Sequence, residues 1–374
     1  MSHVGVNLLW MVPGQVGGTE ESTLASLRAL AARADADLDL RLFVSAELLA
    51  AHGDLADHPR VEVLPWSTRS RATRILAEST WLARATKGLD LVHHAGGTVP
   101  LRRSTPCVLT LHDLQPLERQ ATHGRVKRAY LSLAIPRSVS AARRVVVPSE
   151  FVRRSVLARF GTDPAKVVVV HHGVARSPGE PEDVIRARYD LPGPVVLYPA
   201  ITYPHKNHRV LVAAFAEVVR RRPETTLVLT GGAGTEELAL RRQVADLGLE
   251  ARVRRTGRIP ARDVAGLYDL ADVVAVPSHY EGFGLPAAEA MVHGRALVAA
   301  RTTALPEVVG DAGVLVDPDD VTAWADALAR LLGDPAERGR LAAAGAARSA
   351  RWTWQANAAA LTGVYREALA SGTG

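Results

Sequence analysis

The sequence predicts an α/β fold with two doubly wound domains, each built on a parallel sheet. Short apolar runs alternate with longer amphipathic stretches along the chain, which is typical of βα units. The length of 374 residues is more than one typical core holds. After Gly173 the composition changes to a stretch rich in Pro, Gly and Glu, Ser177–Pro181, which indicates a linker. We therefore expect a first domain over 1–176 and a second over 177–352, followed by a terminal segment, 353–374.

The apolar runs before the linker are expected to form the strands of the first sheet: Val4–Trp10, Leu40–Val44, Val61–Leu64, Leu89–His93, Val108–Leu111, Arg144–Val147 and Val167–Val170. Later runs are expected to form the second sheet: Val195–Tyr198, Thr226–Thr230, Val253–Thr256, Val273–Val276, Ala296–Ala299 and Gly313–Val316. Helices are expected between the later strands, at His208–Arg222, Thr235–Asp246 and Arg262–Leu270. From Thr322 the chain is expected to be helical to its end, interrupted near Arg351–Trp354. In such sheets ligands sit beyond the carboxyl ends of the strands, so an interdomain cleft is expected to hold a two-part substrate.

Composition disfavours several classes of protein. Hydrophobic residues make up 47% and charged residues 22%, as in soluble globular proteins, so neither disorder nor a fibre is expected. The single cysteine, Cys107, cannot form an intrachain disulfide, which favours the reducing cytoplasm. Met1–Pro13 lacks the regions of a signal peptide, and no run approaches the ~20 apolar residues that span a bilayer. We expect a cytoplasmic protein.

The positive charge lies in the first half of the chain. Residues 1–176 hold 23 basic and 15 acidic side chains, and Arg119–Arg159 alone holds ten basic residues with Glu150 as its only acid. An anionic partner would meet this half first, although a solvated Arg-rich surface explains the pattern equally well. Nucleic acid is not the expected partner, because aromatic residues that could interleave with the basic ones make up only 5%.

The most informative segment is Pro277–Gly294, with the sequence PSHYEGFGLPAAEAMVHG. It follows an apolar run, so a strand is expected to end and a helix to begin here. Gly282 and Gly284 permit a tight backbone close to a ligand, and Pro286 suits a first helical turn, where its missing N–H would be unpaired. Free N–H groups at a helix start point toward an anion. The segment therefore predicts a cradle for a diphosphate.

Two glutamates in this segment are candidates for binding hydroxyl groups. Glu281 lies in the expected loop and Glu289 in the expected helix, with seven residues between them. One carboxylate could reach a sugar while the other meets ribose hydroxyls, since carboxylates accept hydrogen bonds well. For the two residues alone, a helix start with an acidic first turn is the commoner explanation.

The whole segment resembles the E-x7-E signature, in its EGFGLPxxEAM setting, of the family 4 retaining glycosyltransferases of the GT-B fold. The resemblance continues downstream through Leu305–Gly310 (LPEVVG), Asp311–Gly313 and Val316–Asp319. Upstream, Tyr203–His208 (YPHKNH) is similar to the family's donor-phosphate lysine region. These matches span nearly all of the second half. They imply two facing Rossmann-like domains with a deep cleft, and a last helix that crosses back to the first domain.

The resemblance implies a metal-independent, retaining transfer of a hexose from a nucleotide-diphosphate sugar to a hydroxyl group, with no cofactor. The acceptor would be a carbohydrate, a lipid-linked molecule or a small molecule. Glu281 would bind hydroxyls of the donor sugar and Glu289 the ribose. Because YPHKNH is similar to members that use GDP-mannose, mannosyl transfer is the first expectation for the donor.

Lys206 is the candidate for binding the diphosphate. It lies between an expected strand and an expected helix, which places an ammonium at the carboxyl edge of the sheet, where it could bind the diphosphate and stabilise it as it leaves. The alternative is a surface lysine at a helix start, which is unfavourable for the helix dipole. Many family members carry an Arg five or six residues earlier, where this chain has Ile201 and Ala200. The donor phosphates are therefore expected to rely on Lys206 and on the backbone of Gly282, Phe283, Gly284 and Leu285.

Glycines after the first strand are candidates for the other side of the donor site. Pro13–Glu20 (PGQVGGTE) opens an expected helix, so its glycines could bring backbone N–H groups to the cleft. The spacing is not the G-x-G-x-x-G dinucleotide fingerprint, and a plain turn is the alternative. Gly17 and Gly18 resemble the family's glycine pair near the donor phosphate and the acceptor.

His112 is the candidate for the reacting face. It ends the run Val108–Leu111, so its imidazole is expected at the carboxyl end of a central strand, where it could bind a sugar hydroxyl or a transferring proton. A structural hydrogen bond is the commoner role for such a histidine. LHDL resembles the family's active-site histidine region, which implies that His112 orients the sugar and that Asp113 is structural. Weaker candidates for acceptor contacts end a neighbouring strand: His93, His94, Gly96 and Gly97.

A nucleobase could stack on, or meet backbone groups of, the loop that starts with Gly257, Arg258 and Ile259, although nothing there indicates which base. No metal site is expected. Asp317–Asp320 (DPDD) has the D-x-D spacing by which other glycosyltransferases hold a metal, but it precedes a helix whose N–H groups an Asp would cap. The thirteen histidines show neither an H-E-x-x-H motif nor a cluster with cysteine.

Trp66–Lys87 interleaves five basic residues with apolar ones. The segment could lie on an anionic membrane at the inner face or bind an acidic acceptor, but a helix packed on its own domain needs the same pattern. Two other functions stay open. One is epimerisation or hydrolysis of a nucleotide sugar on the same fold, and the other is an inactive nucleotide- or carbohydrate-binding protein, against which the set Glu281, Glu289 and Lys206 argues.

Overall fold

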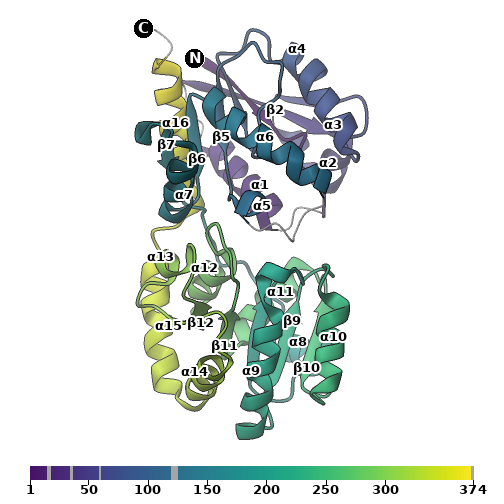
Figure 1. Ribbon diagram of the computed structural model, residues 1–374, viewed down its shortest axis with the longest axis vertical. Coiled ribbons are helices and arrows are strands. Elements are labelled where there is room, and N and C mark those ends of the chain that lie inside the picture. The colour runs from purple at the N-terminus through teal and green to yellow at the C-terminus, as the bar shows by residue number, and fades with distance from the viewer. Residues whose placement is uncertain (15–17, 34–36, 59, 119–124, 372–374) are drawn as a thin grey trace. The chain divides into compact units, whose positions relative to one another are not determined.

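The computed structural model describes residues 1–14, 18–33, 37–58, 60–118 and 125–371 (Figure 1). The chain divides into two compact units. The first, here the N-terminal domain, consists of Met1–Gly173 and Trp354–Gly374, and the second, here the C-terminal domain, is Val174–Thr353. The sequence-based boundaries were 1–176, 177–352 and 353–374. No helix of the described residues is long and apolar enough to cross a membrane.

The N-terminal domain has a parallel seven-stranded sheet in the order β3-β2-β1-β4-β5-β6-β7. Its strands are β1 (Ser2–Asn7), β2 (Leu38–Ser45), β3 (Val61–Leu64), β4 (Leu91–His94), β5 (Cys107–Thr110), β6 (Arg144–Val147) and β7 (Val167–Val169). Its helices are α1 (Gly18–Ala32), α2 (Ala46–Ala51), α3 (Arg71–Ala77), α4 (Ala83–Ala85), α5 (Gln115–Glu118), α6 (Arg125–Ala141), α7 (Glu150–Phe160) and α16 (Trp354–Ala370). A π-helical turn, η2 (Glu78–Leu82), joins α3 to α4.

Each strand expected before the linker is present: Val61–Leu64 and Arg144–Val147 have the predicted bounds, and the others differ at their ends. The first strand stops at Asn7 instead of Trp10, because the side chain of Asn7 accepts a hydrogen bond from the N–H of Leu9 and turns the chain away from the sheet. The central strands are buried on both faces, as parallel sheets require. Because side chains alternate along a strand, neighbouring residues such as His93 and His94 face opposite layers of helices.

The last helix, α16, belongs to the N-terminal domain, although it follows the whole C-terminal domain in the sequence. It packs on α1, and Asn357 accepts a hydrogen bond from Ser26 at 2.5 Å. Buried residues of α16, among them Leu361 and Tyr365, join the apolar cluster formed by β1, β2 and α1. The helix therefore completes one layer of the domain, as Figure 1 shows by its yellow ribbon beside β6 and β7.

The C-terminal domain has a parallel six-stranded sheet in the order β10-β9-β8-β11-β12-β13. Its strands are β8 (Val195–Pro199), β9 (Thr226–Thr230), β10 (Val253–Gly257), β11 (Val273–Val276), β12 (Ala296–Ala300) and β13 (Val314–Val316). Its helices are α8 (Glu182–Tyr189), α9 (His208–Arg221), α10 (Glu237–Asp246), α11 (Ala261–Leu270), α12 (Leu285–Val292), α13 (Leu305–Val309), α14 (Val321–Gly333) and α15 (Pro335–Ser349). Each strand and helix expected here is found within a few residues of its predicted ends.

Both sheets reverse their strand order at one point, and a ligand site is expected at such a switch point, beyond the carboxyl ends of the strands. In the N-terminal domain the switch point lies between β1 and β4. In the C-terminal domain it lies between β8 and β11. The sequence-predicted candidates Lys206 and Glu281 follow these last two strands.

Candidate active site

Lys206 is placed by a short turn that is bonded to the neighbouring strand's loop. It ends a 3₁₀ turn, η5 (Pro204–Lys206), and its carbonyl accepts a hydrogen bond from the hydroxyl of Tyr198 at 2.9 Å. The next residue, Asn207, donates from its side chain to the carbonyls of Pro277 and Pro318, at 3.2 and 2.7 Å. The loop after β8 is thus fixed to the loop after β11.

The structure brings Lys206 and Glu281 together. The ammonium nitrogen of Lys206 lies 2.7 Å from Oε1 of Glu281, and the two side chains are 19% and 10% exposed. An ion pair this sheltered is screened by solvent less than a surface pair. The two residues present a cation and a carboxylate side by side at the switch point of the second sheet.

The segment after Glu281 begins a helix, as predicted. Gly284 has φ +96°, and a Cβ there would lie 2.7 Å from Cδ2 of Leu305, so both conformation and space require glycine. Helix α12 starts at Leu285 with Pro286 in its first turn. The ring of Phe283 is buried and meets Trp352 edge-on at 5.6 Å. The ring of Phe283 therefore packs inside the domain.

Glu289 is held by a residue that the sequence reasoning did not select. The hydroxyl of Tyr268, on α11, donates to Oε2 of Glu289 at 2.7 Å. Burial, together with the neighbouring carboxylate, raises the pKa of Tyr268 well above its usual value, so the phenol keeps its proton. The ring of His293 stacks on Tyr268 with centroids 5.1 Å apart. Tyr268 was visible in the sequence only as one residue of a helix, without a motif.

The expected nucleobase loop starts at the end of the edge strand β10. Gly257 has φ +71°, a Cβ on it would meet no other atom within 4 Å, and its carbonyl accepts from the N–H of Gly231 at 2.8 Å. Arg258 is exposed, whereas Ile259 packs partly against the core. This loop lies at the same edge of the sheet as the loops of Lys206 and Glu281, because all three follow parallel strands.

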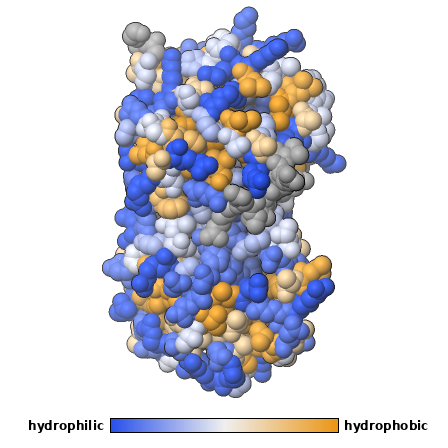
Figure 2. All heavy atoms as spheres, viewed as in Figure 1, coloured by the Kyte–Doolittle hydropathy of each residue, from blue (hydrophilic) through white to orange (hydrophobic). Residues whose placement is uncertain are grey.

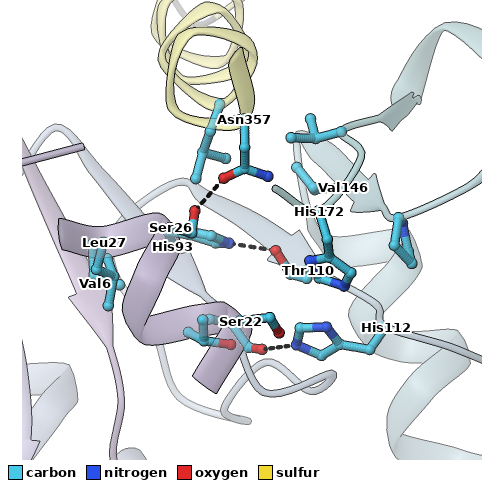
Figure 3. A pocket seen from close by; sticks show the side chains of 15 residues that line it. Val6, Ser22, Ser26, Leu27, His93, Thr110, His112, Val146, His172 and Asn357 are labelled. Carbon is cyan, nitrogen blue, oxygen red and sulfur yellow. Dashed lines mark hydrogen bonds between the residues drawn. The ribbon is translucent and has the colours of Figure 1, made fainter. Parts of the chain in front are cut away.

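In the N-terminal domain His112 follows β5 and lines a pocket (Figure 3). Its Nε2 lies 2.9 Å from the carbonyl oxygen of Ala95. Because a carbonyl only accepts, Nε2 carries the hydrogen and Nδ1 presents a lone pair. That Nδ1 is buried and has no hydrogen-bond partner. Burial lowers the pKa of His112 to about 4, so the ring is neutral at pH 7 and can accept a hydrogen bond from a hydroxyl group.

The pocket is small and mostly neutral. Its cavity volume is about 40 Å³, room for a few water molecules or the hydroxyl groups of a ligand. His172, which follows β7, stacks on His112 with centroids 6.0 Å apart, and burial lowers its pKa to about 3. Figure 3 shows both rings beside Thr110, with Ser22 near His112. The sequence reasoning missed most of the polar lining: Ser22, Thr23, Ser26, Thr110, His172 and Asn357.

The weaker candidates have partners inside the domain. His93 is 4% exposed, and its two ring nitrogens lie 2.7 Å from the hydroxyls of Tyr365 and Thr110. His94 faces the opposite layer, where Nδ1 lies 3.2 Å from the side-chain nitrogen of Asn7. A Cβ on Gly96 would lie 2.3 Å from the ring of Trp10. His94 thus links the ends of β1 and β4, whereas His93 links β4 to β5 and α16.

The glycine pair after β1 is only partly described. Gly18 is exposed and is the first residue of α1, whereas Gly17 lies outside the described residues. In the first turn of α1 the carboxylate of Glu20 accepts from the N–H of Gly14 at 2.9 Å and lies 2.9 Å from Nε2 of His52. Glu20 therefore fixes the described part of the β1–α1 loop.

The DPDD sequence is a helix cap, as predicted. The carboxylate of Asp320 accepts from the N–H of Ala323 at 2.9 Å at the start of α14, and that of Asp317 accepts from the N–H of Asp319 at 3.0 Å. Among the residues that the structure describes, no group of three or more His, Cys, Asp or Glu side chains could hold a metal ion.

Comparisons with known proteins show the family to which the chain belongs. Residues 16–177 match "Glycosyltransferase Family 4" and residues 193–334 match "Glycosyl transferases group 1". The O-antigen chain mannosyltransferase B of Escherichia coli is 30% identical over 282 residues, which cover 74% of this chain and 73% of that protein. The chain belongs to glycosyltransferase family 4.

Two further likenesses extend this family assignment. A D-inositol 3-phosphate glycosyltransferase of Segniliparus rotundus is 32% identical over 78% of this chain, although the match spans only 64% of that relative's length. The structure of Anabaena HepE in complex with UDP and glucose superimposes with a TM-score of 0.76 and 20% identity, covering 98% of this chain and all of that one. This likeness shows the GT-B fold of this family 4 member.

Proposed function

We propose that this family 4 protein is a retaining hexosyltransferase that takes the sugar of a nucleotide-diphosphate donor. The observation that carries the proposal is the pair of Lys206 and Glu281, 2.7 Å apart at the switch point of the second sheet. A diphosphate needs a cation, and a sugar needs groups that accept hydrogen bonds from its hydroxyls. The pair offers the cation and the hydrogen-bond acceptor side by side.

Each group of the site has one task in the proposal. Lys206 holds the diphosphate and stabilises its charge as the bond to the sugar breaks, together with the backbone at the start of α12. Glu281 accepts hydrogen bonds from the sugar. Glu289, oriented by Tyr268, accepts them from the ribose. His112 accepts a hydrogen bond from a sugar hydroxyl through its unpaired Nδ1. No metal ion or cofactor takes part.

The proposal also names a first donor and a first acceptor. GDP-mannose is our first donor, and the name of the Escherichia coli relative supports a mannosyl group. The UDP bound to Anabaena HepE makes UDP-sugars the first alternatives. The name of the Segniliparus relative suggests inositol 3-phosphate as one acceptor to include.

A donor panel tests the reaction. The protein is incubated in EDTA with GDP-mannose and UDP-hexoses, with and without inositol 3-phosphate and simple glycosides, and products are followed by mass spectrometry and NMR. We expect an acceptor-dependent product whose anomeric configuration matches the donor's. Free sugar without acceptor would indicate a hydrolase, and a changed hexose on the nucleotide would indicate an epimerase. Nucleotide binding without any turnover would leave only a binding protein.

We also propose that this protein works in the cytoplasm, in peripheral contact with an anionic membrane through Trp66–Lys87. Trp66 is 41% and Leu76 58% exposed, with Arg69 and Arg71 between them in the sequence, while Ala77 and Leu82 are buried against the domain. Figure 2 shows apolar and polar groups interleaved over the part of the N-terminal domain where α3 and α4 lie. Sedimentation with phosphatidylglycerol vesicles at low salt tests this, with Trp66→Ser/Leu76→Ser as the variant. Absence of wild-type binding would exclude the contact.

A further inference from the structure

Three non-glycine residues of the described chain have a positive φ angle: Asp190 at 52°, Asn207 at 55° and Thr303 at 55°. Asn and Asp adopt this left-handed conformation more readily than other residues, and Asp190 does so at an ordinary helix end, the C-cap of α8. Thr303 is β-branched, and for such a residue the conformation is strained. Strain of this kind persists only where the surrounding structure imposes it, and it gathers at functional sites.

Thr303 contacts the backbone of Glu281. It lies in the loop between β12 and α13, and its Oγ1 accepts a hydrogen bond from the N–H of Glu281 at 3.0 Å. The next residue, Ala304, donates its own N–H toward the carbonyl of Glu281 at 3.4 Å. Consecutive residues of one loop therefore hold both polar groups of the Glu281 backbone, while its side chain bonds Lys206.

The same loop fixes the start of α12. Leu305, two residues after Thr303, fills the space beside Gly284 that a Cβ there would need. On the other side of the ion pair, Asn207 ties the Lys206 turn to Pro277 and Pro318. Two of the three left-handed non-glycine residues in the described chain thus flank Lys206 and Glu281, one beside each partner.

We propose that Thr303 is a positioning residue whose hydroxyl holds Glu281 in the orientation that binds the donor sugar. The hydroxyl explains why a strained threonine stands here and not a glycine. Glycine would adopt φ +55° without cost, but it would leave the N–H of Glu281 without this acceptor. Serine keeps the acceptor, whereas valine keeps the shape and loses it. This inference rests on the proposed function, in which Glu281 binds the sugar hydroxyls.

Three variants separate the hydroxyl from the strain: Thr303→Ser, Thr303→Val and Thr303→Gly. We expect kcat/KM for the nucleotide sugar to fall roughly tenfold to a hundredfold in the valine and glycine variants, as a small misplacement of a binding group does, and to stay within about threefold in the serine variant. The fall is expected in kcat, with the Kd of free UDP or GDP within about twofold, because Lys206 is retained. Asp190→Gly is the matched control, since it places glycine at a left-handed position far from the proposed site, at the end of α8, and is expected to leave kcat/KM unchanged.

Thermal unfolding distinguishes positioning from plain structure. Relief of strain is expected to raise the Tm of Thr303→Gly by about 1–3 °C while its activity falls. A glycine variant with wild-type kcat/KM would overturn the inference, and so would equal losses in the serine and valine variants.

Amide hydrogen exchange gives a readout that needs no substrate. The N–H of Glu281 is expected to exchange faster in Thr303→Val and Thr303→Gly than in the wild type, and to recover in Thr303→Ser. If the wild type turns over no nucleotide sugar, the proposed function fails, and exchange at Glu281 still decides whether Thr303 holds that backbone. Equal protection in all four proteins would refute the contact itself.

Discussion

Replacing Lys206 by methionine tests the centre of the proposed donor site. Methionine has a similar length and no charge, so the diphosphate loses one charge-assisted hydrogen bond. Such a bond contributes about 1.5–3 kcal/mol, which corresponds to a Kd for UDP or GDP that rises about 10- to 150-fold. Isothermal titration calorimetry with both nucleotides measures it, and circular dichroism verifies the fold. An unchanged Kd for whichever nucleotide the wild type binds would refute the phosphate role of Lys206.

Removing the charge of Glu281 is expected to have the opposite effect on nucleotide binding. In the free protein the ammonium of Lys206 already bonds Glu281, so the diphosphate must share it with a carboxylate of its own sign. Glu281→Gln removes that competition, and we expect UDP or GDP to bind roughly fivefold more tightly, as for the loss of a repulsion of about 1 kcal/mol. Turnover of the nucleotide sugar should fall at the same time. The Lys206→Met/Glu281→Gln double variant serves as control, because it leaves neither charge without its partner.

The buried rings give three further predictions. Tyr268→Phe removes the hydroxyl that orients Glu289. We expect the KM for the donor to rise about 3- to 10-fold in steady-state assays, with kcat nearly unchanged. An unchanged KM would contradict the proposal that Glu289 binds the ribose. His112→Ala is expected to lower kcat/KM about tenfold to a hundredfold. Because the pKa of His112 is about 4, we expect the pH–rate profile of the wild type to show no titration of His112 between pH 6 and 8. A change of rate near pH 6.5 that is present in the wild type and absent from the variant would contradict a neutral ring. His93 and His94 have folded pKa values of about 3, below the unfolded value of about 6.5, so they contribute stability that is present above pH 6.5 and lost as the pH falls toward 3. At pH 5 each should reduce the free energy of unfolding by about 2 kcal/mol relative to pH 7.5, measured by urea denaturation. His94→Gln should show a smaller loss, and a wild type equally stable at both pH values would rule out neutral burial.

The fold was predictable because its signals are local. Each strand is a short apolar run between turn residues, so the strands could be found one by one, and their alternation with helices indicates the doubly wound class of fold. Where a strand differs from its prediction, only its ends differ, as at Asn7, whose side chain accepts a hydrogen bond from the following backbone. The order of strands could not be read from those runs, although it fixes the switch points at which the candidate residues meet.

The candidate site was predictable where its residues lie in one motif. Glu281, Glu289 and Gly284 stand close together in the sequence, and the loop and helix that join them fix their spacing. Tyr268 and Thr303 could not be found this way, because they lie outside the motif and contact Glu289 and Glu281 from another helix or loop. Asn357 reaches the pocket of the N-terminal domain from 331 residues beyond Ser26, a separation at which no periodicity carries information.

The discontinuous N-terminal domain has a consequence for how the chain is made. Its sheet and α1 are translated before the C-terminal domain, whereas their covering helix, α16, is translated after it. Until then the faces that Leu361 and Tyr365 will cover stay open to solvent, while the C-terminal domain can already close its own core. The N-terminal domain can therefore complete its apolar core only after the C-terminal domain has been translated.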